Sequence, residues 1–271
     1  MAEPDDLIQT RLRVLTWNLW WRFGPWEARQ PAILATLRRV DADVVALQET
    51  WDDATSSQVR DLAEALGYHH AFGTGFAGFP ETFGNAVLSR WPIGNTETRP
   101  LEAVEGLDEL RVVLRAEIDG PRGPFDVYST HTNWRLDQSH VRQRQVRGIC
   151  ELVKERQDEL TLPPILCGDF NADPDADEIR LLTGKAAIPV PKLVFIDAWQ
   201  AAGDGPGFTW SNVNPFAAEG LEPDRRLDYV FVGYPRPGGA GHVVSARIEG
   251  VDAFDGINPS DHYAMCAELR Y

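Results

Sequence analysis

The sequence has no long hydrophobic run, and its first residues lack the pattern of a signal peptide. A membrane-spanning helix needs roughly 18 or more consecutive apolar residues, and no stretch of this 271-residue chain approaches that length. Its first residues include Glu3, Asp5 and Asp6, whereas a signal peptide starts with a basic segment and continues with an apolar one. We therefore expect a cytoplasmic protein without a membrane span.

Cysteine is scarce. The chain contains three, Cys150, Cys167 and Cys266, an odd number spread widely along the sequence. Each lies among apolar residues, and none has the close spacing that is typical of zinc ligands or of a disulfide framework. We predict that all three are buried thiols.

Positive charge is also in short supply. The chain has 26 lysines and arginines against 41 aspartates and glutamates, which gives a net charge of −15. Proteins that bind long duplex nucleic acid usually present a basic surface that displaces counterions, so we expect no tight binding of bulk duplex DNA. The acidity suits a site that gathers carboxylates around a divalent cation, although most of these residues must be solvated surface.

No segment has the composition of an interdomain linker, because proline and glycine are scattered along the chain rather than pooled. Hydrophobic residues make up 43% of the sequence, enough to build a sizeable core. We predict a flexible tail over residues 1–10 and a single domain over residues 11–271.

The first part of the chain alternates predicted strands with predicted helices. Leu12–Trp17 alternates in hydrophobicity and predicts a core strand that ends at Asn18. Pro31 suits the first position of a helix, and the apolar run Val44–Leu47 predicts a buried strand with Glu49 at its tip. A polar residue therefore follows each of these strands.

An antiparallel section is predicted after a helix over residues 56–66. The glycine- and phenylalanine-rich residues 72–84 favour a lid or recognition loop over a strand. Strands are expected next over residues 85–90, 93–98, 110–118 and 125–132. The last of them places His131 at its end.

The second part of the chain continues in the same way. A helix capped by Asp137 or Ser139 is expected to reach about Gln157. Further strands are predicted over residues 164–169, 208–212, 225–232, 243–248 and 264–269.

The stretch Gly168-Asp169-Phe170-Asn171 carries the strongest chemical signal. Alternate residues of an extended chain point the same way, so Asp169 and Asn171 face one target while Phe170 faces the core. A carboxylate can align a water or a metal, and an amide can hold a phosphoryl oxygen. An Asx turn at a strand end explains this stretch equally well when it is taken alone.

Polar residues recur at strand ends or in adjoining loops throughout the chain. They are Asn18, Glu49, His131, Asp169 with Asn171, Asp228, and Asp261 with His262. With their neighbours they form the motifs Thr16-Trp17-Asn18, Leu47-Gln48-Glu49, Gly84-Asn85-Ala86-Val87-Leu88-Ser89-Arg90, Gly168-Asp169-Phe170-Asn171, Arg226-Leu227-Asp228-Tyr229 and Ser260-Asp261-His262. In this order, from Leu12 to Leu269, they resemble the endonuclease/exonuclease/phosphatase superfamily.

The resemblance implies an α/β fold of the α+β kind: a four-layered sandwich of two mostly antiparallel β-sheets packed face to face, with helices outside and an active site at one end. It also implies a divalent-metal-dependent hydrolase of phosphoester bonds, a phosphodiesterase or phosphatase. A DNA or RNA endo- or exonuclease of the same superfamily is the alternative. A member that binds a ligand without turnover is a third possibility.

Each candidate residue has an expected role. Asn18, Glu49 and Asp261 offer oxygen ligands for one or two Mg²⁺ or Mn²⁺ ions. Asp169 would orient or deprotonate the attacking water, and Asn171 would hold a phosphoryl oxygen. Asp228 would fix the tautomer of His262, and His131 would stabilise the charge of the transferred group. Whether Asp169 or His262 is the base stays open.

Structural roles are the alternative for each residue taken alone. Asn18 could cap a turn, Asp228 could pair with Arg226, His131 could be a hydrogen-bonded core histidine, and Glu49 could be a solvated strand end. Their combination in one chain favours the functional interpretation.

The substrate is less well defined by the sequence. Abasic-site nucleases carry an acidic residue two positions after the first asparagine, where this chain has Trp20. Asn85, Trp134 and Arg226 are candidate substrate-binding residues. The expected partner is a phosphoester, either a small molecule, a lipid headgroup or a nucleic-acid end, on which aromatic rings could stack. The oligomeric state does not follow from the sequence.

Overall fold

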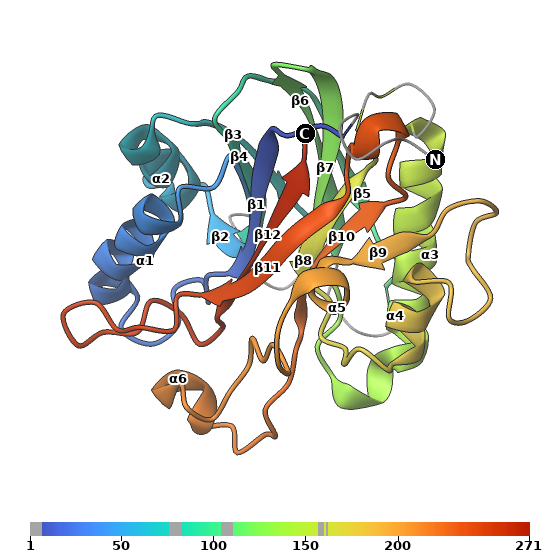
Figure 1. Cartoon of the computed structure of the whole chain (residues 1–271). Helices are drawn as coiled ribbons and strands as arrows, with labels where there is room; N and C mark the ends of the chain where they lie inside the picture. Colours follow the sequence, from blue (N-terminus) through green and yellow to red (C-terminus); the bar gives the residue numbers. More distant parts are fainter. Residues whose placement is uncertain (1–6, 76–82, 104–110, 157–159, 161) are drawn as a thin grey trace.

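A computed structural model describes residues 7–75, 83–103, 111–156, 160 and 162–271 (Figure 1). The first sheet contains β1 (Arg11–Asn18), β2 (Val44–Trp51), β3 (His69–Thr74), β4 (Phe83–Ser89), β11 (Val243–Glu249) and β12 (Ala264–Arg270). The second contains β5 (Ile93–Pro100), β6 (Val112–Gly120), β7 (Gly123–His131), β8 (Ile165–Asp169), β9 (Phe195–Asp197) and β10 (Asp228–Gly233).

Both sheets have six strands and are largely antiparallel. The strand orders are β11-β12-β1-β2-β4-β3 and β5-β6-β7-β8-β10-β9. One pair in each sheet is parallel, β1 with β2 and β7 with β8. These two parallel pairs matter for function, because the carboxyl ends of parallel strands meet at one edge of a sheet.

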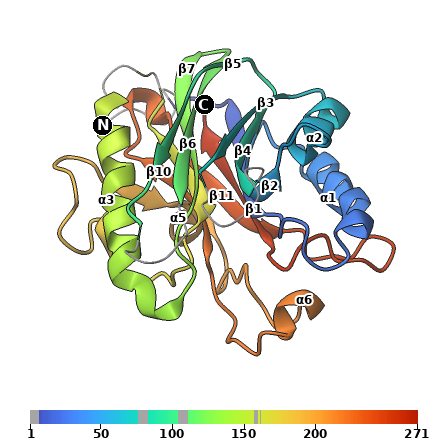
Figure 2. The same ribbon diagram turned by 180° about the vertical axis from the view of Figure 1, so that it is seen from behind.

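Helices cover the outer faces of the two sheets. On the first sheet lie α1 (Trp26–Val40) and α2 (Gln58–Leu66), and on the second lie α3 (Ser139–Arg156) and α4 (Asp177–Leu182). Figures 1 and 2 show the two helix groups on opposite sides of the molecule. The short helices α5 (Ala198–Ala202) and α6 (Pro215–Ala218) and the 3₁₀ turns Leu136–Gln138 and Pro237–Gly239 lie in connections.

Three apolar clusters fill the spaces between these layers. The largest lies between the sheets and includes Val14 and Val87 from the first and Val127 and Val230 from the second. Separate clusters join each sheet to its helices. Helix, sheet, sheet and helix therefore follow one another across the molecule, which confirms the predicted four-layered sandwich.

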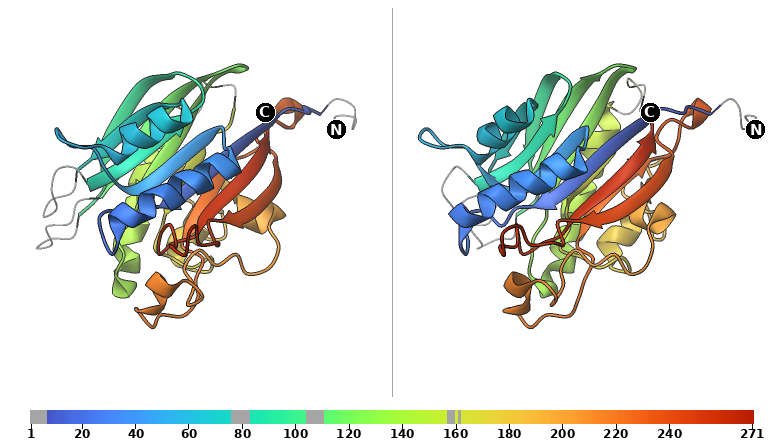
Figure 3. Two further views of the ribbon diagram at one scale, coloured as in Figure 1. Left: turned by 90° about the vertical axis from the view of Figure 1, so that its left-hand side faces the viewer. Right: turned by 60° about the vertical axis from the view of Figure 1, so that its left-hand side comes forward.

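Strand register brings the polar strand ends to one end of the sandwich. Asn18 is paired with Gln48 across the parallel strands β1 and β2. His131 is paired with Asp169 across β7 and β8, and Asp228 at the start of β10 also faces Asp169. The connection that carries α6 and the loop between β11 and β12 lie at this same end (Figure 3).

Two predicted elements differ from those observed. Helix α1 begins at Trp26, so Pro31 lies inside it rather than at its start. Proline removes the N–H that would bond to the carbonyl of Glu27, and Glu27 is exposed, so water can bond that carbonyl instead. Residues 208–212 do not form a strand, because only Trp210 makes isolated bridges, to Arg225 and to His262.

The expected loop over residues 72–84 is partly wrong. Residues up to Thr74 belong to β3 and residues from Phe83 belong to β4, while 76–82 lie outside the described residues. A Cβ atom on Gly84 would lie 2.3 Å from the carbonyl oxygen of Gly73. These glycines allow two strands to approach closely, which the sequence pattern did not distinguish from loop flexibility.

The remaining general predictions concern the tail, the cysteines and membrane spans. Residues 1–6 of the expected tail lie outside the described part, and Ile8 donates its backbone N–H to Gly238 and accepts a hydrogen bond from Arg270. All three cysteines are buried, as predicted. Among the described residues, no helix is both long and apolar enough to cross a membrane.

Candidate active site

A cavity of about 350 Å³ opens at the end of the sandwich where the polar strand ends meet. It is lined by Asn18, Trp20, Phe23, Glu49, Phe83, Arg111, His131, Trp134, Asp169, Asn171, Trp210, Glu222, Arg225, Leu227, Asp261 and His262. The structure thus brings together all but one of the predicted catalytic and metal-binding residues. The exception, Asp228, is fully buried behind His262.

Several residues around the cavity have a left-handed backbone that side chains other than glycine rarely adopt. Glu49 has φ 54°, Asn171 has φ 49° and Trp20 has φ 55°. Glu49 lies where the register between β2 and β4 shifts, between Leu47 and Thr50. Such bulges redirect side chains, and backbone strain of this kind clusters at functional sites.

Asp169 is the most heavily bonded carboxylate in the cavity. Its Oδ1 accepts the backbone N–H of Asn171 at 2.9 Å, and its Oδ2 accepts the side-chain amide of Asn18 at 3.0 Å. Burial by itself would raise the pKa of Asp169, but the neighbouring His262 and His131 and these hydrogen bonds hold it below its usual value. Asp169 is therefore ionised at neutral pH.

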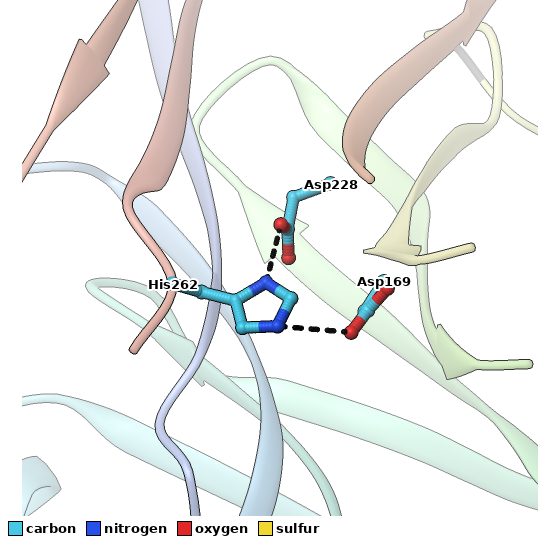
Figure 4. A group of neighbouring side chains, drawn as sticks. All are labelled: Asp169, Asp228 and His262. Atoms are coloured by element: carbon cyan, nitrogen blue, oxygen red, sulfur yellow. Dashed lines mark hydrogen bonds and ion pairs between the residues drawn. The ribbon is translucent and has the colours of Figure 1, made fainter. Parts of the chain in front are cut away.

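His262 and Asp228 form a hydrogen-bonded pair (Figure 4). The Nδ1 atom of His262 lies 2.8 Å from Oδ2 of Asp228, and its Nε2 lies 3.7 Å from Oδ2 of Asp169. Burial opposes the charged ring, yet Asp228, Asp169 and Asp261 raise the pKa of His262 well above its usual value. Burial also raises the pKa of Asp228 to about 6, so near neutral pH the pair is an imidazolium and a carboxylate.

His131, unlike His262, is neutral at neutral pH. Burial, then Arg111, lowers the pKa of His131 well below its usual value. The side-chain amide of Asn171 lies 3.0 Å from Nε2 of His131 and also donates to the carbonyl of Thr132. An amide nitrogen only donates, so Nε2 is the acceptor and the proton of the neutral ring lies on Nδ1. That Nδ1 has no hydrogen-bond partner among the described residues.

Glu49 and Asp261 have the properties of cation ligands. Burial, then the proximity of Asp261, raises the pKa of Glu49 to about 7. One carboxylate oxygen of Glu49, Oε2, is buried with no hydrogen-bond partner among the described residues. Two neighbouring carboxylates, one with an unsatisfied oxygen, fit a hard divalent cation, which prefers oxygen ligands.

A second group of potential ligands lies nearby. Oxygen or nitrogen atoms of Asp169, Asp228 and His262 lie within 4.8 Å of one another. The hydrogen bond between His262 and Asp228 uses one ligand atom of each, and the imidazolium repels a cation. The donor set around Glu49 and Asp261 is therefore the better candidate metal site.

Asn18 is oriented differently from the expected metal ligand. Its Oδ1 accepts the backbone N–H of Trp20 at 2.9 Å. Its Nδ2 donates to Glu49 at 3.2 Å and to Asp169 at 3.0 Å. Asn18 therefore holds the carboxylates of Glu49 and Asp169 in a fixed relation, and this geometry favours an orienting role.

The structure does not bring two of the substrate-binding candidates to the cavity. Asn85 is fully buried and donates to the backbone carbonyls of Val112 and Ser129. Arg226 forms a two-point ion pair with Asp197, at 3.1 and 2.7 Å. The third candidate, Trp134, lines the cavity and is 52% exposed.

Sequence reasoning missed part of the cavity wall. Arg111 lines it directly before β6, and Trp210 lies 5.0 Å from the ring of His262. Arg225 also lines the cavity, and its Nε donates to Asp173 at 2.9 Å. Arg111 lies at the start of a predicted strand, and that position could have indicated a cavity residue. No local sequence pattern marks Trp210 as one.

Comparisons with known proteins show the family of the chain. The sequence profile described as the Endonuclease/Exonuclease/phosphatase family matches residues 15–262. The uncharacterized protein YbhP of Escherichia coli (strain K12) is 33% identical over 184 residues, which cover 62% of this chain and 70% of YbhP.

Solved structures show the same fold. Mannosyl-6-phosphatase Bt3783 of Bacteroides thetaiotaomicron aligns with a TM-score of 0.76 and 22% identity over 96% of this chain and 100% of that chain. Truncated TDP2 of Caenorhabditis elegans aligns with a TM-score of 0.74 and 19% identity over 98% of this chain and 100% of that chain. Members of the matched family hydrolyse phosphoester bonds. With the match spanning nearly its whole length, the chain belongs to the endonuclease/exonuclease/phosphatase family.

Proposed function

We propose that the protein is a divalent-metal-dependent hydrolase of phosphoester bonds that uses in-line attack of water. The observation that carries the proposal is the pairing of opposite charge states in one cavity. An ionised Asp169 lies 3.7 Å from the imidazolium of His262, beside Glu49 with its unsatisfied oxygen. Phosphoryl transfer needs a base, a proton donor and positive charge close to one phosphorus atom.

The charge states assign the proton-transfer roles. Asp169 is ionised and accepts the proton of the attacking water, because His262 already carries both ring protons. His262 donates through Nε2 to an oxygen of the phosphoryl group or of the leaving group, and Asp228 stabilises its positive charge. This division makes Asp169 the proposed base.

His131 supplies a neutral hydrogen-bond donor. Asn171 bonds to Nε2 of His131, which directs the Nδ1 proton toward the side of the cavity that holds Glu49, 3.8 Å away. We assign the phosphoryl contact to this Nδ1 proton, because both amide protons of Asn171 are already engaged. Asn171 thus acts by orienting His131.

Glu49 and Asp261 would hold the Mg²⁺ or Mn²⁺ ion, and Asn18 would orient Glu49. When bound, the ion would neutralise phosphoryl charge as a Lewis acid. We propose one ion for this donor set, because Asp169 is engaged as the base and Asp228 as the partner of His262.

A small-molecule or lipid phosphoester is the preferred substrate class. The cavity is the size of a small-molecule site. Its lining includes Trp20, Phe23 and Trp134, and the net charge of −15 repels a polyanion. The structural similarity to a mannosyl-6-phosphatase supports a phosphomonoester among the candidates. A nucleic-acid end stacked on Trp134 is the second candidate. We also propose a cytoplasmic location, where thiols such as the three buried here stay reduced.

A substrate panel tests the proposal. Purified protein would be incubated in Mg²⁺, Mn²⁺ or EDTA with bis-p-nitrophenyl phosphate, p-nitrophenyl phosphate, sugar phosphates, an inositol polyphosphate, sphingomyelin and oligonucleotides. Turnover that depends on the metal and is abolished by EDTA is expected with a small or lipid ester. Oligonucleotide cleavage that falls steeply as salt rises would favour the nuclease. Metal binding without turnover of any substrate would favour a ligand-binding protein.

A further inference from the structure

Arg29 is a buried cation that the proposed chemistry does not use. It lies on α1 and is fully buried, and it does not line the cavity. Its guanidinium donates to five backbone carbonyls, those of Leu19 at 2.8 Å, Pro259, Trp20 and Trp21 at 2.9 Å and Phe23 at 3.0 Å. All five acceptors are neutral carbonyls, so no carboxylate bonds directly to this buried charge. Burying a charge without such a partner is costly, and a functional role would explain why the chain keeps an arginine here.

The five carbonyls belong to two segments that carry candidate metal-site residues. Residues 19–23 directly follow Asn18, and Pro259 lies two positions before Asp261. One guanidinium therefore clamps the end of β1 to the loop that precedes β12. A further hydrogen bond joins the same two segments, because the hydroxyl of Ser260 donates to the carbonyl of Asn18 at 2.7 Å.

The clamp also reaches the end of β2. The backbone N–H groups of Leu19 and Trp21 donate to the carbonyls of Gln48 and Glu49, both at 3.0 Å. Trp20 and Trp21 have φ values of 55° and 31°, a strained conformation that points their carbonyls toward Arg29. Strain of this kind persists only where the surroundings enforce it, and the guanidinium does so by donating to the carbonyls of Trp20 and Trp21.

The charge of Arg29 has a second effect. Burial lowers the pKa of Arg29 to about 10, while Asp261 and Glu49 act in the opposite direction. The side chain is therefore charged at neutral pH, and it offsets the repulsion between the two carboxylates without bonding to either. Arg29 thus acts on all three segments of the candidate metal site while touching none of its oxygen ligands.

We propose that Arg29 is a positioning residue. It sets the metal affinity of the site by fixing the relative positions of Asn18, Glu49 and Asp261. This inference rests on the proposed function, because it assumes that Glu49 and Asp261 hold the ion. It predicts that Arg29→Lys weakens metal binding although no metal ligand has changed. Lysine keeps the charge but offers three donors from a single atom, which cannot reach five carbonyls.

The experiment compares two equally buried arginines. Arg115 is 1% exposed and bonded to Asp126 at 2.8 Å in a network that does not line the cavity, so Arg115→Lys is the matched control for loss of stability. Mn²⁺ affinity would be measured by calorimetry, and thermal unfolding would be followed without metal. We expect Arg29→Lys to weaken Mn²⁺ binding ~10-fold or more, the usual effect of losing an outer partner of a metal site, and Arg115→Lys to leave it within about twofold.

The outcomes separate this inference from the proposed function. Wild-type protein that binds no Mn²⁺ would overturn both. Tight binding by wild type with equal affinity in Arg29→Lys, or an equal loss in Arg115→Lys at a matched drop in melting temperature, would overturn the role of Arg29 alone. If Arg29→Lys does not fold, Arg29→Gln tests the same clamp, because its shorter amide keeps donors but cannot span the five carbonyls: weaker Mn²⁺ binding supports the inference, and unchanged binding contradicts it.

Discussion

Asp228 holds His262 by a 2.8 Å hydrogen bond to Nδ1 and leaves Nε2 facing the cavity. Both residues are buried, so the charge of one is balanced chiefly by the other. The pair therefore fixes the tautomer, the orientation and the charge of the imidazole together. Its partner across the cavity, Asp169, stays ionised and ready to accept a proton.

Asp228→Asn tests this relationship. An amide is neutral, so it cannot stabilise the imidazolium and the pKa of His262 should fall. Because catalysis uses the protonated ring, activity is present below that pKa and is lost as pH rises through it. We expect kcat to drop ~100-fold or more, and the alkaline limb of the pH–rate profile to move to lower pH. An unchanged alkaline limb would show that Asp228 does not control the charge of His262.

Glu49 should make metal binding depend on pH. Burial and Asp261 raise the pKa of Glu49 to about 7, so below that pH a proton competes with the ion for the carboxylate. Mn²⁺ affinity is expected to fall by about tenfold per pH unit below pH 7, as displacement of one proton requires. Calorimetry at several pH values measures this slope. Glu49→Gln should bind Mn²⁺ weakly and with a flatter pH dependence, and an unaltered slope would assign the titration to another residue.

Trp134 should contribute to substrate binding rather than to the chemical step. Its ring is 52% exposed at the cavity and lies 5.0 Å from the guanidinium of Arg135. Removing a stacking surface costs about 1–3 kcal/mol of binding, so Trp134→Ala should raise KM ~10-fold with little change in kcat. Leu136→Ala is the matched control, because Leu136 is 67% exposed and does not line the cavity. Equal effects of both variants on KM would remove Trp134 from the binding site.

Local pattern predicted most of the individual strands and the polar residues at their ends, whereas the four-layered sandwich followed from the resemblance of the ordered motifs to a known superfamily. Buried strands show as short apolar runs, and their polar ends are visible in the sequence within two residues, as at Asp169. Parallel pairing then brings those ends together. The order of the motifs supplied the pairing of the sheets, which periodicity alone does not encode.

Partners that are distant in sequence could not be predicted. Arg226 is bonded to Asp197 and Arg29 to Pro259, and no local pattern marks either contact. An arginine beside a catalytic motif suggests a substrate contact, whereas its burial in an ion pair depends on the tertiary structure. Gly84 shows the same limit, because a close approach of two strands and a flexible loop both use glycine.

The most direct test of the proposed mechanism is the turnover of Asp169→Asn in the presence of saturating Mg²⁺ or Mn²⁺, with the best substrate of the panel. Asparagine keeps the size of the side chain but cannot accept the proton of the attacking water. We expect a loss of at least ~100-fold in kcat, with metal affinity largely retained because Asp169 is not assigned as a ligand. Wild-type turnover by Asp169→Asn would contradict the account, since the account assigns the proton of the attacking water to Asp169 alone.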